Sequence, residues 1–430
     1  MSIPEYNSFS SHQKDIIANI LSDDTTKRKR ILGSAGSGKT MIMSYCASKL
    51  ASQEKRVLLI IYNKTLIQQI RYMVNNYYEL EKGLFSAEDV SKYVDIDNYH
   101  HFMWHNIPDT DTFADLEYTS GNNLTQEQID GYLFNSSFTF IKYDYIFIDE
   151  MQDLKPNSIM SLINFLNPDG KMIVFADKYQ HIYNNNQYES ETEGDTSHVP
   201  AFPHNSGFVG KWTRLTEVFR SNSIIQQKGI EFAKQNLFSI YGEEKINLSG
   251  ELIDSSIDYY TNYSDSALIK AVKMFNPRQQ ANTAIIVHDI SEVNNICRLL
   301  EENGIKYSSI LENRRRFNVH LNTLTVSTVK SFKGLEAQNV IYINDSNSTK
   351  DEDNFVAVTR AIKKLIIFDI SKFTSLNKIY KEFEKDFNET FCNEKIIKPK
   401  KFHPVKMNIV EEPHKEISEN KFTRKVFVHK

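Results

Sequence analysis

The stretch GSAGSGKT, residues 33–40, decides the fold of this chain. It matches the full pattern G-x-x-x-x-G-K-[ST], in which glycines let backbone N–H groups wrap a polyphosphate. RKRILG before it predicts a short strand, and apolar residues at helical spacing from Ile42 to Leu50 predict a helix. This context favours a nucleotide-binding α/β domain over the alternative, a glycine-rich structural turn.

The residues of this loop have expected roles in binding a nucleotide. Lys39 should reach the outer phosphates, and the Thr40 hydroxyl should bind Mg²⁺. The positions expected to surround the phosphates are Gly33, Ser34, Ala35, Gly36, Ser37, Gly38, Lys39 and Thr40.

A second stretch, YDYIFIDEMQDLKP at 143–156, places three acids at the end of a strongly hydrophobic strand. Acids are common where strands end. Beside a phosphate-binding loop, however, a carboxylate at the end of a neighbouring strand would hold the metal ion. We expect Asp149 in that role, and we expect Glu150 to orient or deprotonate the attacking water. An acid pair here favours hydrolysis over phosphoryl transfer to a bound acceptor.

The composition is that of an ordinary soluble globular protein of two or three domains. The chain has 430 residues, of which 40% are hydrophobic and 25% charged, and its net charge is −4. Any nucleic-acid site must therefore be a local groove. The chain has no run of 18 apolar residues, no signal-peptide pattern at its start, and three cysteines without metal-site spacing. We expect a cytoplasmic protein with no membrane partner.

Further polar stretches follow in order along the chain. They are KMIVFADKYQHIY (171–183) with Asp177 and Gln180, LTEVFRS (215–221) with Phe219 and Arg220, VSTVKSFKGLEAQNVIYIN (326–344) with Lys330, Lys333, Gly334 and Glu336, and DNFVAVTRAIKKLIIFDI (353–370) with Arg360. Taken one at a time, the arginines could be surface residues, Phe219 a core residue and the lysines a solvated face. The complete set in this order is more informative than any member.

The set resembles the superfamily-1 helicases, specifically the UvrD/Rep group, over most of residues 9–370. Weaker elements fit as well: Gln13 in FSSHQKDII, Asn63 and Lys64 in LLIIYNKTLIQQI (58–70), and NYHHF at 98–102. The resemblance implies an α/β fold with two RecA-like P-loop NTPase domains, parallel sheets flanked by helices, and ATP with Mg²⁺ in the cleft between them.

The resemblance also implies domain limits. The first domain would span 1–214 with a small insertion at about 70–140, and the second would span 215–370. Residues 371–430 would be a basic C-terminal extension, either a solvated tail or a DNA- or partner-binding arm.

By matched position, the resemblance assigns roles to individual residues. Catalytic roles fall on Lys39, Asp149, Glu150, Gln180, Arg220 and Arg360, and metal binding falls on Thr40 and Asp149. Phe219 would stack on adenine, Gln13 would read its edge, and Glu336 would bind the ribose. Gln152 and Asp153 would link the hydrolytic acids to DNA-contacting and interdomain elements. Contacts to nucleic acid would come from Asn63, Lys64, Tyr99, His100, Phe102 and Lys330.

The implied function is an ATP-dependent DNA translocase or helicase, a DNA-dependent ATPase that moves 3′ to 5′ on single-stranded or tailed duplex DNA. The alternative is an ATP-switched regulatory or sensor subunit of a nuclease-containing complex, such as a phage-defence system. DEMQD together with two arginine motifs nearly excludes a P-loop kinase.

Two departures from the family pattern favour the alternative. Asn184, Asn185 and Asn186 stand where the family continues with a base-stacking aromatic residue and Arg-Gly, and we expect 184–210 to be a flexible surface loop. Only about 106 residues separate Ser221 from Ser327, too few for the family's large helical insertion.

Overall fold

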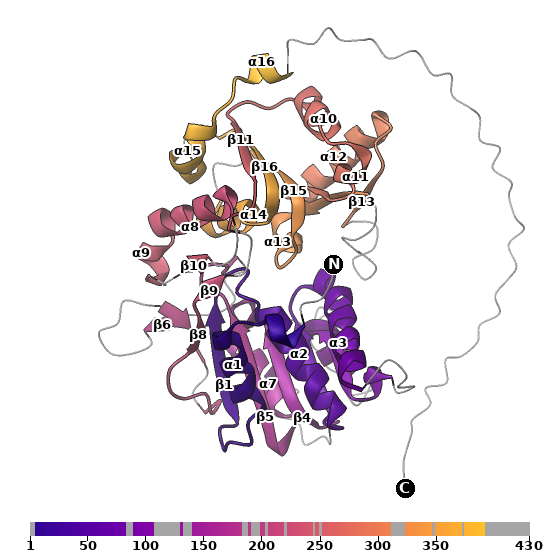
Figure 1. Ribbon diagram of the computed structural model, residues 1–430, viewed down its shortest axis with the longest axis vertical. Coiled ribbons are helices and arrows are strands. Elements are labelled where there is room, and N and C mark those ends of the chain that lie inside the picture. The colour runs from indigo at the N-terminus through magenta and orange to yellow at the C-terminus, as the bar shows by residue number, and fades with distance from the viewer. Residues whose placement is uncertain are drawn as a thin grey trace, which may run out of the picture. The chain divides into compact units, whose positions relative to one another are not determined.

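Two six-stranded parallel sheets, each covered by helices, make up the described part of the chain (Figure 1). The computed structural model describes residues 5–82, 89–106, 130–131, 140–182, 188–190, 198–202, 205–218, 222–243, 246–248, 252–310, 323–345, 349–371 and 374–391. Both sheets belong to one compact unit, residues 1–392. The predicted α/β class, with two RecA-like domains of parallel strands flanked by helices, is confirmed.

The first sheet has the strand order β3-β2-β4-β5-β1-β8. Its strands are β1 (Arg28–Gly33), β2 (Val57–Ile61), β3 (Val94–Asn98), β4 (Tyr143–Asp149), β5 (Leu166–Ala176) and β8 (Thr213–Leu215). All five pairings are parallel. Every residue of β2 is buried, because a parallel sheet is covered on both faces and its inner strands are apolar throughout.

Helices cover both faces of this sheet. The elements are η1 (Tyr6–Ser8), α1 (Ser11–Leu21), α2 (Lys39–Ser52), η2 (Lys64–Leu66), α3 (Ile67–Lys82), η3 (Val90–Lys92), α4 (Tyr99–His105), η4 (Met151–Asp153) and α7 (Pro156–Ile163). Helices α1, α2 and α3 share one hydrophobic core with alternate residues of β2, while α4 and α7 share the core on the opposite face. The range 70–140, predicted as an insertion, therefore includes β3, a strand of the sheet itself.

The second sheet has the strand order β11-β16-β15-β12-β14-β13, again parallel throughout. Its strands are β11 (Ser256–Tyr260), β12 (Thr283–Val287), β13 (Tyr307–Ser309), β14 (Leu324–Thr328), β15 (Ala337–Asn344) and β16 (Ala361–Asp369). The helices of this half are α8 (Ile224–Asn236), α9 (Phe238–Tyr241), α10 (Asp265–Lys273), α11 (Pro277–Gln280), α12 (Ile290–Glu302), α13 (Val329–Phe332) and α14 (Asp351–Val358).

Two short strand pairs lie outside the two large sheets. Strands β6 (Tyr188–Ser190) and β7 (His198–Pro200) pair antiparallel inside the range predicted as a flexible loop, and β9 (Glu217–Val218) pairs with β10 (Asn247–Leu248). Asn184, Asn185 and Asn186 lie outside the described residues. None of the helices in the described part of the chain has the length and apolar character that a membrane span requires.

The second half extends past residue 370, where the sequence places the start of a separate extension. It continues through α15 (Ser375–Tyr380), η5 (Lys381–Phe383) and α16 (Phe387–Phe391). The Phe391 ring lies 4.9 Å from that of Tyr260, and the Lys385 N–H donates to the Tyr259 carbonyl at 3.0 Å. Apolar residues at helical spacing therefore attach 374–391 to β11. The basic stretches predicted at 395–406 and 420–430 lie outside the described residues.

Candidate nucleotide site

The phosphate-binding loop leaves β1 at Gly33 and enters α2 at Lys39. Gly36 and Gly38 have φ angles of +80° and +89°, a backbone region that other residues rarely adopt. A Cβ atom at Gly38 would lie 2.5 Å from the Gln13 side-chain nitrogen. The hydroxyl of Ser37 is buried and has no hydrogen-bond partner among the described residues. A phosphate oxygen could satisfy it, so the loop fits the polyphosphate that its sequence implies.

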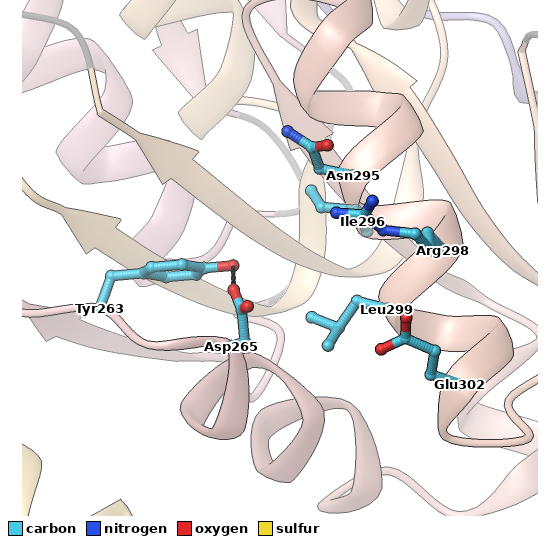
Figure 2. A pocket seen from close by; sticks show the side chains of 7 residues that line it. All are labelled: Tyr263, Asp265, Asn295, Ile296, Arg298, Leu299 and Glu302. Carbon is cyan, nitrogen blue, oxygen red and sulfur yellow. Dashed lines mark hydrogen bonds between the residues drawn. The ribbon is translucent and has the colours of Figure 1, made fainter.

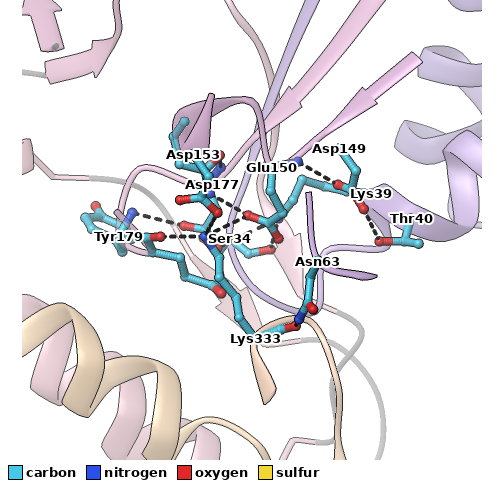
Figure 3. Close-up of polar contacts among 12 residues, drawn as sticks. Ser34, Lys39, Thr40, Asn63, Asp149, Glu150, Asp153, Asp177, Tyr179 and Lys333 are labelled. Atoms are coloured by element: carbon cyan, nitrogen blue, oxygen red, sulfur yellow. Dashed lines mark hydrogen bonds and ion pairs between the residues drawn. The ribbon is translucent and has the colours of Figure 1, made fainter. Parts of the chain in front are cut away.

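Lys39 and Thr40 face the acidic strand end (Figure 3). The Lys39 ammonium donates to the Gly33 carbonyl at 2.7 Å and lies 3.7 Å from the Asp177 carboxylate. The Thr40 hydroxyl donates to the Asp149 carboxylate at 3.1 Å. A hydroxyl and a carboxylate this close are the oxygen ligands that Mg²⁺ prefers, so these two residues fit the predicted metal site.

The pKa values of the neighbouring acids Asp149 and Glu150 are shifted in opposite directions. Burial and the charge of Glu150 raise the pKa of Asp149 to about 6. Burial also acts to raise the pKa of Glu150, but the charges of Lys333 and Lys39 outweigh it and hold the pKa at about 2. Glu150 is therefore ionised at neutral pH. The lysine charges thus favour the ionised form of Glu150, which can accept a hydrogen bond from a water molecule.

The backbone of Glu150 is itself unusual. Its φ and ψ are +53° and +47°, the left-handed region, which costs a residue other than glycine about 1–3 kcal/mol. Such strain persists only where surrounding contacts enforce it. Here the Glu150 N–H donates to the Asp149 side chain at 3.0 Å, and η4 follows immediately.

The rest of the DEMQD stretch joins the acids to other loops. The Gln152 amide donates to the Glu150 carboxylate, and its oxygen accepts from the Asp177 N–H at 3.1 Å. Asp153 forms an ion pair of 2.6 Å with Lys333, which comes from the second sheet. The predicted link from Gln152 and Asp153 to other elements thus has specific contacts.

Gln180 and Arg360 meet at the same place. The Gln180 amide donates to Asp177 at 2.6 Å, and its oxygen accepts from the Arg360 guanidinium at 3.0 Å. Arg360 is only 1% exposed, and its Nε donates to the Val356 carbonyl at 2.8 Å. The structure therefore brings Arg360, from the end of α14, against the first sheet. Arg220 and Phe219 lie outside the described residues.

Gln13 and Glu336 have different surroundings. Gln13 is buried; its oxygen accepts from the Ser10 N–H at 3.1 Å, and its nitrogen donates to the Ser37 carbonyl at 3.1 Å. Its side chain thus braces the phosphate-binding loop in this structure. Glu336 is half-buried and lies immediately before β15, next to the loop that carries Lys333.

The residues predicted to contact nucleic acid divide into two groups. Lys64, His100 and Lys330 are exposed. Tyr99 and Phe102 are 0% and 5% exposed and lie in the core, because positions three apart on α4 face the sheet. Their rings are therefore covered in this structure, and the expectation that they contact nucleic acid stays a prediction.

Asn63, the remaining nucleic-acid candidate, is used differently. Its amide nitrogen donates to the carbonyls of Ser331 and Lys333, at 3.0 and 2.6 Å. This residue thus joins the two sheets. Lys333 is the site residue to which sequence reasoning assigned no role. The sequence feature that could have indicated this role is the excess of acids in DEMQD. If these carboxylates are buried, a cation must lie beside them to balance their charge.

A cavity of about 280 Å³ lies elsewhere, between the segment after β11 and helix α12 (Figure 2). Its lining residues are Tyr263, Asp265, Asn295, Ile296, Arg298, Leu299 and Glu302. The Tyr263 hydroxyl and the Asp265 carboxylate are 3.3 Å apart across its edge. Because its lining includes no residue of the phosphate-binding loop, this cavity is not the nucleotide site.

Two family profiles match the chain. One, described as an AAA domain, covers residues 13–186, and the other, described as a viral superfamily 1 RNA helicase core domain, covers residues 108–369, more than half of the chain. The chain belongs to the superfamily-1 helicases. The longer match is to the viral type of this superfamily rather than to the UvrD/Rep group that the motifs resemble, so the finer assignment is not established by it.

No curated protein matches this helicase chain in sequence. Among solved structures, it is similar to the PRRSV helicase (10% identity, 84% of this chain and 55% of that one, TM-score 0.38). It is also similar to the helicase called arterivirus nonstructural protein 10 (11% identity, 86% of this chain and 63% of that one, TM-score 0.40). The complex of that helicase with DNA matches in the same way (13% identity, 83% of this chain and 63% of that one, TM-score 0.39). The chain thus spans between 55% and 63% of the length of these helicases.

Proposed function

We propose that this superfamily-1 helicase hydrolyses ATP to move 3′ to 5′ along single-stranded DNA. The observation that carries the proposal is the contact of Arg360 with Gln180, whose amide in turn bonds Asp177 beside Lys39. A permanently charged group from the second sheet thereby reaches the phosphate-binding side of the first. An NTPase whose two domains contribute to one site can convert hydrolysis into relative movement of those domains.

Roles follow from these positions. Thr40 and Asp149 would hold Mg²⁺, whose charge offsets that of the phosphate oxygens. Lys39 would exchange its carbonyl contacts for the outer phosphates. Glu150, held ionised, would orient the attacking water, and Arg360 would stabilise charge on the transferred phosphoryl group. Gln180 would sense that group because it already bonds Arg360 at 3.0 Å.

The choice of DNA and of direction rests on the motif forms DEMQD, TEVFRS and VAVTRA, which resemble those of the UvrD/Rep group. Lys64, His100 and Lys330 are exposed and would contact the strand. Glu336 would bind the ribose, Gln13 would read adenine after releasing one of its present hydrogen bonds, and Phe219 and Arg220 would complete the site.

The first experiment is steady-state ATP hydrolysis with no nucleic acid, with single-stranded DNA, and with RNA of the same sequence, beside a Lys39→Ala control. We expect strong stimulation by DNA that the control abolishes. Stimulation by RNA alone would instead favour the viral RNA helicase type. Hydrolysis that ignores both would contradict an autonomous translocase and favour the regulatory subunit. Strand displacement on duplexes with a 3′ or a 5′ tail then tests the direction.

A further inference from the structure

Lys333 lies where the second sheet meets the hydrolytic acids (Figure 3). Its ammonium is 2.6 Å from the Asp153 carboxylate and 3.3 Å from that of Glu150. It also donates to the Gln180 carbonyl at 2.6 Å. The Lys333 side chain is 2% exposed, so all three contacts form away from water.

The backbone around Lys333 is held just as closely. The Asn63 amide donates to the carbonyls of Ser331 and Lys333. The Thr65 hydroxyl also donates to the Ser331 carbonyl, at 3.1 Å. Gly334 follows with a φ of +82°, and a Cβ atom there would lie 2.5 Å from Leu66. The loop from Ser331 to Gly334 is therefore clamped by the segment that follows β2 of the first sheet.

The same loop has an exposed side. Lys330 and Lys333 lie three residues apart at the short helix α13, Lys330 exposed to solvent and Lys333 buried against the acids. A nucleic-acid strand that bound Lys330 would act on the backbone that places Lys333. The distance between the acids and the second sheet would then depend on whether the strand is bound.

We propose that Lys333 is the positioning residue through which the second domain, and the nucleic acid bound to it, controls Glu150. With the ammonium in place, Glu150 is fixed between Gln152 and Lys333 and can orient the attacking water. When the loop withdraws, Glu150 loses its cation and hydrolysis slows. The inference rests on the proposed ATPase and extends it to the coupling between nucleic acid and hydrolysis.

A purely structural ion pair is the competing interpretation. Removing one partner of a buried pair is strongly destabilising, so loss of activity in a single variant would not distinguish the two. The double variant Lys333→Met with Asp153→Asn removes both charges together and avoids leaving either one unpaired. The matched control is Lys364→Met, which removes a lysine whose ammonium lies 2.6 Å from Asp258 within the second sheet.

The experiment measures kcat and KM for ATP, with and without saturating single-stranded DNA and RNA, together with the melting temperature and the affinity for a fluorescent ATP analogue. In Lys333→Met and in the double variant, we expect kcat with nucleic acid to fall at least tenfold towards the unstimulated rate. KM and analogue affinity should stay within about threefold, because among the described residues the Lys333 ammonium contacts Asp153, Glu150 and the Gln180 carbonyl rather than the phosphate-binding loop. Lys364→Met should keep its stimulation.

Each outcome has one meaning. If the double variant melts like the wild type and is stimulated as strongly, Lys333 does not couple nucleic acid to hydrolysis and the inference is overturned. If KM rises while stimulation remains, Lys333 acts on nucleotide binding and the inference is also overturned. If the wild type itself shows no stimulation by either nucleic acid, the proposed function fails first, which is a distinguishable result.

Discussion

The carboxyl edges of the two sheets have the same architecture but opposite chemistry. In the first sheet, β1 ends at the phosphate-binding loop, β4 ends at Asp149, and β5 is followed by Asp177. These groups lie beside Lys39 and Thr40 of the phosphate-binding loop.

In the second sheet, the corresponding groups satisfy one another. The His288 ring bonds the Tyr342 hydroxyl at 2.8 Å, and that hydroxyl donates to Asn354 at 2.6 Å. The Asn344 amide and the Tyr259 hydroxyl both donate to the Asp369 carboxylate, at 3.0 and 2.6 Å.

The difference shows how two similar domains divide one task. In the described residues, the polar groups at the second edge bond one another rather than surrounding a glycine-rich loop. Its contribution comes instead from two connections, the loop after α13 with Lys333 and the end of α14 with Arg360. Both supply a cation to a site that the first domain lines with carboxylates.

The largest effect should come from removing the second domain's arginine. We expect Arg360→Ala to lower kcat for ATP about 10³-fold or more, the range typical of an arginine finger. Arg360→Lys should recover little, because an ammonium lacks the planar pair of donors. Single-turnover hydrolysis measures this, and a loss of less than tenfold would remove Arg360 from the catalytic set.

The first domain's carboxylate gives the next effect. We expect Glu150→Gln to lower kcat about 10²-fold to 10³-fold, because the amide keeps the shape but loses the charge that orients water. Affinity for a fluorescent ATP analogue should be retained, because Lys39 and Thr40 are untouched. Near-normal turnover in this variant would mean that another group orients the water.

Two buried tyrosines allow a comparison of two hydrogen bonds. Tyr179 bonds across the two domains, whereas Tyr259 bonds within the second domain. Tyr179 is fully buried, donates to the Gly242 carbonyl at 2.9 Å and stacks on Phe238. Tyr179→Phe and Tyr259→Phe should each lower the free energy of unfolding by about 1–2 kcal/mol, because each removes one buried hydrogen bond. We expect only the Tyr179 change to lower kcat as well. Urea denaturation measures the stability of the two variants, and ATPase assays measure their kcat. If both variants lower kcat equally, the Tyr179 contact between the domains has no specific role in hydrolysis.

The smallest effect concerns pH. Burial, and then the charges of Lys333 and Lys350, lower the pKa of His181 from 6.5 to about 4. The unfolded chain therefore binds more protons between these values, so stability present above pH 6.5 should decline as the pH falls towards 4. His181→Gln should flatten this dependence in urea denaturation. An unchanged slope would assign it to another group, such as His288, whose pKa burial also lowers.

Much of the first domain's site could be predicted because its chemistry is encoded in short stretches. GSAGSGKT and DEMQD each fix residue type and spacing within a few positions. The Thr40 hydroxyl bonds Asp149, and the charge of Lys39 acts on both Asp149 and Glu150. The parallel sheets follow similarly from apolar strands that alternate with helices.

The contacts between the sheets could not be read in this way. Asn63 bonds residues 268 and 270 positions away, and Lys333 bonds Asp153 at a separation of 180. Such pairings depend on how two surfaces approach, which no local pattern encodes. The burial of Tyr99 and Phe102 depends on the phase of α4 against its sheet, and the attachment of 374–391 depends on an aromatic contact with Tyr260.

Gly334 lies where the loop of the second domain comes close to Leu66 of the first domain. Since Leu66 leaves no space for even one methyl group there, Gly334→Ala would act as a wedge between the domains, and Leu66→Ala would remove the obstruction. The backbone angle of +82° would still oppose the alanine, which makes this position a sensitive gauge of how closely the halves meet. An engineer could thus set the separation of the two domains by side-chain volume alone, leaving every charged group of the candidate nucleotide site in place.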